Sequence, residues 1–160
     1  MAYQIPLCVF VALASIFGSS AVSVADEPLV GFKLGASFLE AKEHANSKGW
    51  QLVALSENLP GQWIVEEQDI SLFVCEGKIT GISQQHPPDL DAFTKTVFET
   101  SQKLGEPDVK IVSFMSGVGR ISTVDARFRT SEGGVRISLS STVGEMGMTI
   151  NRWTDSSCES

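Results

Sequence analysis

The sequence feature that most constrains the fold is a regular alternation of apolar and polar residues between positions 121 and 153. Three segments alternate, and their apolar members are Val124, Ala126 and Phe128, then Val135, Ile137 and Leu139, then Met146, Met148 and Ile150. A period of two is typical of antiparallel strands that turn one face to a core and the other to water. Turn-forming residues separate the segments at 131–134 and 141–144. The last third of the chain therefore predicts a three-stranded meander with an open polar face.

The N-terminal segment has the pattern of a signal peptide. Residues 1–25 carry no charged side chain, and an apolar run at 5–17 is followed by Ser23, Ala25 and an abruptly charged start at Asp26. Cleavage after Ala25 fits this pattern, although the segment before the apolar run lacks Lys and Arg. The alternative is an uncleaved anchor, but the run is shorter than the roughly 20 residues that span a bilayer. We expect a periplasmic or secreted protein with no stable membrane insertion after cleavage.

The charge balance narrows the choice of partner. The 160 residues carry a formal net charge of −7, and an acidic domain is repelled by nucleic acid, which is therefore not an expected partner. The length favours a single domain, placed at residues 26–153 and followed by a polar tail at 154–160.

Two cysteines remain once residues 1–25 are removed, Cys75 and Cys158. In an oxidising compartment such a pair predicts one disulfide bond. The alternative is a reactive thiol at Cys75, but no neighbouring base or cationic cluster in the sequence supports it.

Two helices are predicted from their capping residues. Ser37 and Glu40 form a capping box, and the helix that follows ends at Gly49. Asp89 is the predicted N-cap of the second helix, which ends at Gly105. Strands are expected at 32–34, 50–55, 62–67, 70–75, 78–83 and 108–114, and residues 84–88 are expected to be a linker.

These elements predict an α+β fold with two helices packed on one face of an antiparallel sheet. The expected order is β-α-β-β-β-β followed by α-β-β-β-β. The halves at 32–83 and 89–153 are similar in pattern only, since no residue-by-residue repeat relates them.

No catalytic motif stands out. The chain has two histidines and lacks the usual spacings of nucleophile elbows, phosphate-binding loops and zinc sites. We expect no cofactor, no metal and no catalysis. The alternative is a small secreted hydrolase that uses His86 and nearby carboxylates such as Asp89.

An arginine cluster lies on the polar side of the meander. If residues 131–134 close as a four-residue loop, Arg129 faces Arg136, with Arg127 two residues along on the same side. Like charges opposed across strands are destabilising. Either Asp125, Glu132 or helix carboxylates neutralise the cluster, or it binds an acidic partner, since arginine favours bidentate carboxylate contacts.

The segment 114–120 joins large apolar residues to glycines. One interpretation is a hairpin whose Phe114 and Met115 enter the core. The other is a mobile loop that binds a partner through Met115 and Arg120, because functional residues concentrate on loops.

Two short signatures resemble those of small bacterial envelope domains, a set that includes the β-lactamase inhibitory protein and the small outer-membrane assembly lipoproteins. They are the run Leu-Gly-Ala-Ser-Phe-Leu-Glu-Ala at 34–41 and Leu-Gly-Glu-Pro at 104–107. The resemblance implies a helix-and-sheet unit that binds other proteins through its sheet or loops without catalysis. It assigns no role to any single residue. We therefore expect an exported binding module for another envelope or extracellular protein with an acidic surface.

Overall fold

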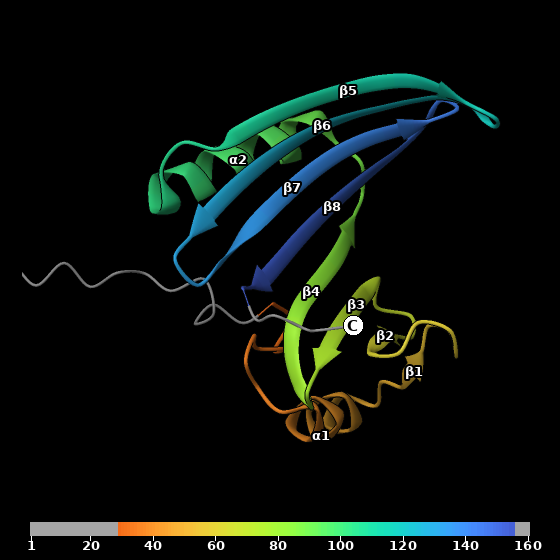
Figure 1. The fold of residues 1–160 in the computed structure, drawn as a ribbon, viewed down its shortest axis with the longest axis vertical. Helices are drawn as coiled ribbons and strands as arrows, with labels where there is room; N and C mark the ends of the chain where they lie inside the picture. The colour runs from red at the N-terminus through yellow and green to blue at the C-terminus, as the bar shows by residue number, and fades with distance from the viewer. Residues whose placement is uncertain (1–28, 156–160) are drawn as a thin grey trace, which may run out of the picture.

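The structure, a computed structural model, describes residues 29–155 and consists of a large antiparallel sheet with two helices (Figure 1). In chain order the elements are α1 (Phe38–Lys48), β1 (Leu52–Ala54), β2 (Gln62–Val65), β3 (Ile70–Cys75), β4 (Lys78–His86), α2 (Leu90–Leu104), β5 (Asp108–Ser116), β6 (Gly119–Thr130), β7 (Gly133–Thr142) and β8 (Glu145–Thr154).

The sheet is built from two four-stranded meanders joined edge to edge. Its strand order is β1-β2-β3-β4-β8-β7-β6-β5, and every neighbouring pair is antiparallel. The junction is the pairing of β4 with β8, which places Ser83 opposite Asn151. Each meander follows one helix in the chain, so the same helix-and-meander unit is used twice, with β1 and β5 at the two outer edges.

The predicted fold class and element order are wrong, because the sheet dominates and the first predicted strand is absent. Residues 32–34 form no strand: Phe32 makes only an isolated bridge with Leu29, and Leu34 lies in a turn. Gly31 and Gly35 have φ values of 91° and 79°, which break the extended backbone on both sides. Phe32 is buried nonetheless, so this segment reaches the core from a turn.

The strands from β4 onward are longer than the sequence pattern indicated, whereas β1 and β2 are shorter than the strands predicted at 50–55 and 62–67. The predicted linker at 84–88 is strand as far as His86, since β4 continues its pairing with β8 up to the His86–Met148 pair. In the second meander, β6 extends over 12 residues and β7 over 10. Residues that were expected to form turns thus add to the ladders, and sheet content rises at the expense of loops.

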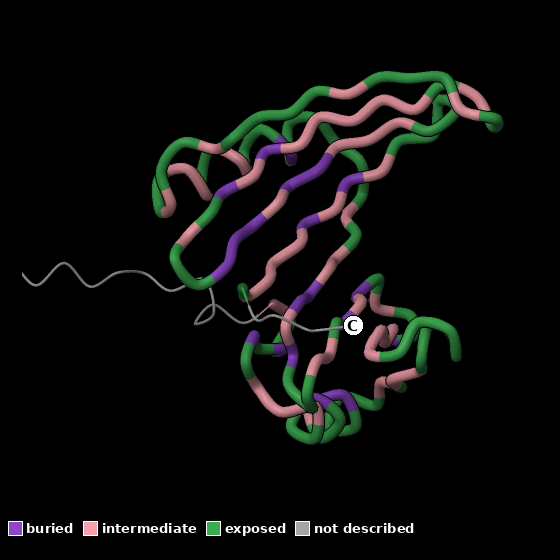
Figure 2. Tube along the Cα trace, viewed as in Figure 1, coloured by how far each residue is buried: buried purple, intermediate pink, exposed green. Residues whose placement is uncertain are grey.

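One face of the sheet carries the core. The registers place Val65 opposite Ile70 in the first meander and Ala126 opposite Ile137 in the second, all buried. The helices add buried residues to the same cluster, Ala41 and Ala45 from α1 and Phe93 from α2. Figure 2 shows buried positions on the inner strands, including the first half of β7, and none on β5. Burial of this apolar surface is the main stabilising contribution to the fold.

We expect the capping box of α1 to contribute measurably to stability. The Ser37 hydroxyl and backbone N–H both donate to the Glu40 carboxylate, at 2.8 Å and 2.7 Å, and the Glu40 N–H donates back to the Ser37 hydroxyl. Replacing Ser37 with alanine should cost about 1 kcal/mol of unfolding free energy in a urea titration. A variant as stable as the wild type would show that the cap is dispensable.

The same contacts predict a pH dependence. The Ser37 side-chain and backbone hydrogen bonds lower the pKa of Glu40 below its usual value. Because the folded-state pKa is depressed, this stabilisation is present above the unfolded-state pKa and is lost as the pH falls through the folded-state pKa. Ser37→Ala should therefore flatten the acid limb of the stability curve.

Candidate binding site

The sheet face opposite the core, called the open face below, is covered by no helix within residues 29–155. Its side chains form rows across the strands, as the registers show. One row contains Gly81, Trp153, Gly134 and Arg129 in β4, β8, β7 and β6. The next row along the strands contains Ser83, Asn151, Arg136, Arg127 and Asp108. Two adjacent rows therefore bring all three predicted arginines to one region of the open face.

The predicted pairing of Arg129 with Arg136 is wrong; Arg127 lies opposite Arg136, and Arg129 lies opposite Gly134. The reason is the turn, since β6 ends at Thr130 and β7 begins at Gly133, leaving a two-residue connection. The actual register differs from the predicted one by two residues. A shift of two returns each side chain to the same face, so the arginines still share the open face.

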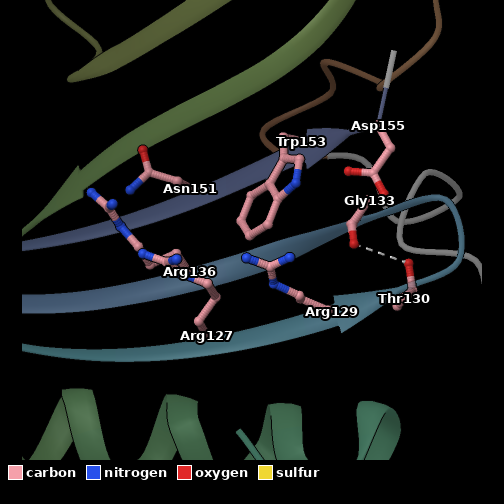
Figure 3. Close-up of a pocket in the computed structure, with 8 residues that line it drawn as sticks. All are labelled: Arg127, Arg129, Thr130, Gly133, Arg136, Asn151, Trp153 and Asp155. Carbon is pink, nitrogen blue, oxygen red and sulfur yellow. Dashed lines mark hydrogen bonds between the residues drawn. The ribbon is translucent and has the colours of Figure 1, made fainter. Parts of the chain in front are cut away.

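The arginines line a hollow of about 580 Å³ (Figure 3). Its lining residues are Arg127, Arg129, Thr130, Gly133, Arg136, Asn151, Trp153 and Asp155. A second hollow of about 510 Å³ shares Arg127, Arg136 and Asn151 with the first and extends to Lys110, Asp125 and Ser138. The two adjoining hollows lie on β5, β6, β7 and β8 and are together called the cationic trough below.

The trough is positively charged within an acidic protein. Four cationic side chains, those of Lys110, Arg127, Arg129 and Arg136, face two carboxylates, those of Asp125 and Asp155, which gives a net +2. The whole chain carries −7. The trough is therefore a local reversal of the protein's charge, and such a patch attracts anionic groups.

The predicted neutralisation of the arginines by nearby carboxylates is not observed in residues 29–155. Among residues 29–155 no ion pair involves Arg127, Arg129 or Arg136. Asp125 instead accepts a hydrogen bond of 2.6 Å from the buried Ser138 hydroxyl. The Nε atom of Arg136 is buried without a hydrogen-bond partner. A buried donor of this kind is costly unless a ligand satisfies it.

Trp153 forms an aromatic wall at one end of the trough. The indole lies directly over Gly134, where an added Cβ atom would collide with the ring and with the Phe128 carbonyl oxygen. Glycine at position 134 thus makes room for the ring. Trp153 is half-buried, and tryptophan and arginine are both enriched among the residues that dominate binding at protein interfaces.

Sequence reasoning missed Trp153 and Asn151. The signal was present, because both fall on the polar phase of the third alternating segment, opposite to Met148 and Ile150. Extending the alternation to the last residue of the strand would have placed both beside the arginines.

The other two predicted binding residues lie elsewhere. Met115 pairs with Arg120 in the β5–β6 hairpin, and the register puts both on the side of the sheet that carries the core. Arg120 contacts the Ser113 hydroxyl at 3.4 Å. The expectation that Phe114 and Met115 enter the core is wrong, since both are exposed. The segment is also a tight hairpin, with only Gly117 and Val118 between its strands.

No hydrogen bond joins His86 and Asp89 among the described residues. His86 ends β4 opposite Met148, and its Nε2 atom is buried without a hydrogen-bond partner. The Asp89 carboxylate accepts a hydrogen bond from the Asp91 N–H at the start of α2. Neither hollow of the trough is lined by His86.

Several predicted features fall outside the described residues. Cys75 ends β3, but Cys158 is not in the described range, so their pairing stays a prediction. The predicted signal peptide at 1–25 and most of the predicted polar tail lie outside it too. Between residues 29 and 155 no helix is long and apolar enough to span a membrane. In that range no group of three His, Cys, Asp or Glu side chains is placed to hold a metal ion.

Comparison of the chain with protein-family models, with curated proteins and with solved structures finds no match.

Proposed function

We propose that this protein is an exported, non-catalytic binding module that recognises the acidic surface of another envelope or extracellular protein through its cationic trough. The observation that carries the proposal is the direct opposition of Arg127 and Arg136 across β6 and β7 without a carboxylate partner in residues 29–155. Opposed like charges destabilise a sheet. A partner carboxylate placed between the two guanidinium groups would remove that repulsion on binding.

The lining of the trough supports a protein surface as the ligand. Arginine offers a planar fork of donors that matches a carboxylate, and Trp153 adds apolar contact area beside it. The Asn151 amide and the hydroxyls of Ser140 and Thr149 line the trough and provide neutral hydrogen-bonding groups. An acidic patch flanked by an apolar side chain is the partner chemistry that fits this combination.

The proposal is tested by affinity capture with wild-type protein and with a variant that combines Arg129→Glu and Arg136→Glu. The wild type should retain acidic proteins from the envelope and extracellular fractions of its source organism and should release them as salt rises, because screening weakens such contacts. The double variant should retain none of these proteins.

Arg120→Glu is the matched control, since it reverses an exposed arginine on the other side of the sheet. It should retain the same proteins as the wild type. Capture of the same proteins by the double variant, at the same salt concentration, would contradict the proposed surface.

A further inference from the structure

The outer edge of the second meander is an unprotected strand. β5 lies at the end of the strand order and pairs over its nine residues with β6 only. No other described backbone hydrogen bond reaches it. The edge at the opposite end of the sheet is β1, which has three residues. In Figure 1, β5 runs along the top of the sheet with its outer side clear of both helices.

The side chains of β5 do not block pairing with another strand. Natural edge strands are commonly protected by shortness, proline, bulges or charges. β5 contains no proline, its ladder with β6 has no register shift, and its two charged residues, Asp108 and Lys110, both lie in its first three positions. The rest of the strand is uncharged, yet Ile111 is 74% exposed and Met115 67%.

The pattern of the uncharged part is symmetric about Ser113. Ile111 and Met115 flank it on the side of the sheet that carries the core, and Val112 and Phe114 flank it on the open face. A second copy in antiparallel orientation, centred on Ser113, would therefore place Ile111 opposite Met115 and Val112 opposite Phe114. Apolar pairs of this kind stabilise neighbouring strands. Lys110 would lie opposite Ser116, so no like charges would be opposed.

We infer that β5 pairs with β5 of a second copy of this chain, around a two-fold axis through Ser113, to form a symmetric dimer with one continuous sheet. A two-fold interface must be complementary to itself, and the symmetric pattern around Ser113 meets this requirement. An axis perpendicular to the sheet leaves both open faces on the same side. This inference is independent of the proposed function.

Beside this edge lies an apolar hollow of about 310 Å³ on the side of the sheet that carries the core, with Ile111, Val124, Leu139 and Met146 among its lining residues. Pairing around Ser113 brings Met115 of the second copy opposite Ile111 at its rim. The dimer would thus cover apolar surface that α2, which contacts β6 and β7, leaves open.

The test is sedimentation equilibrium of the purified protein over a range of concentrations. The wild type should reach twice the mass of one chain. Ile111→Lys alone and Met115→Glu alone should each lose the dimer, because each places an unpaired charge in the interface. Both side chains are largely exposed, so neither change should alter the melting temperature of the monomer much.

Combining Ile111→Lys with Met115→Glu tests the register itself. In the pairing around Ser113, each new lysine lies opposite the new glutamate of the second copy, so the double variant should recover the dimer. Leu39→Lys is the matched control: Leu39 is 66% exposed but lies on α1, away from the β5 edge, and the dimer should persist.

Salt gives an independent readout. Two copies of charge −7 repel each other, so screening should strengthen the dimer as salt rises. A wild type that stays monomeric at all concentrations overturns the inference. A dimer that survives Ile111→Lys, or a double variant that stays monomeric, overturns pairing around Ser113.

Discussion

Replacing Gly134 with alanine is expected to destabilise the fold and to displace the aromatic wall of the cationic trough. Gly134 is buried between β6 and β8, and a methyl group there would meet the Phe128 carbonyl oxygen and the Trp153 ring. The Phe128 carbonyl group is held in the sheet, so it cannot move aside as the end of a flexible side chain could. Overpacking of this kind typically costs about 1–3 kcal/mol, which urea unfolding would measure.

Gly117→Ala is the matched control. Gly117 lies in the β5–β6 turn, and an added Cβ atom there would meet nothing within 4 Å. Its stability should stay at or slightly above that of the wild type, because alanine restricts the unfolded chain. If Gly134→Ala were as stable as Gly117→Ala, Trp153 would have room to move, and the aromatic wall would not depend on Gly134.

Reversing the charge of Arg127 is expected to separate stability from binding. Arg127→Glu converts the opposed pair with Arg136 into an opposite-charge pair but also places a carboxylate opposite Asp108 of β5. The two effects have opposite signs, so the unfolding free energy should change by less than about 1 kcal/mol. The same change removes one of two guanidinium groups from the proposed carboxylate site. Affinity for the captured partner should fall at least about tenfold, or roughly 1.4 kcal/mol.

Arg127→Gln should have a smaller effect on affinity than Arg127→Glu. It removes the Arg127–Arg136 repulsion within the sheet but does not repel an acidic partner. Its affinity should lie between those of the wild type and Arg127→Glu. Loss of stability in both variants, with normal binding, would instead make Arg127 an internal counter-charge and place the binding surface elsewhere.

The alternating pattern predicted correctly on which face of the sheet each side chain lies, but not which residue it pairs with on the neighbouring strand. Val124, Ala126 and Phe128 point away from Arg127 in the structure as the pattern required. The register of β6 and β7 was wrong by two residues, because glycines at 133 and 134 were assigned to a loop and instead form strand. The error left every side chain on its predicted face, since strand periodicity is two.

The pattern of residues within each segment did not predict that β4 pairs with β8 and so joins the two meanders. The Ser83–Asn151 pair links residues far apart in the chain, and nothing in either strand specifies its partner. The glycines at 31 and 35 show the opposite case, because their left-handed backbone conformation prevents the alternating segment Phe32-Lys33-Leu34 from forming the predicted strand.

The most direct test of the open face as a binding surface is arginine-specific chemical labelling, with and without the captured partner. Each residue serves as its own reference, because the extent of phenylglyoxal modification is compared between the free and bound protein. Binding at the trough predicts that Arg127, Arg129 and Arg136 become protected in the complex, while Arg120, on the other side of the sheet, is labelled equally in both. Unchanged labelling of the three trough arginines in a saturated complex would contradict it.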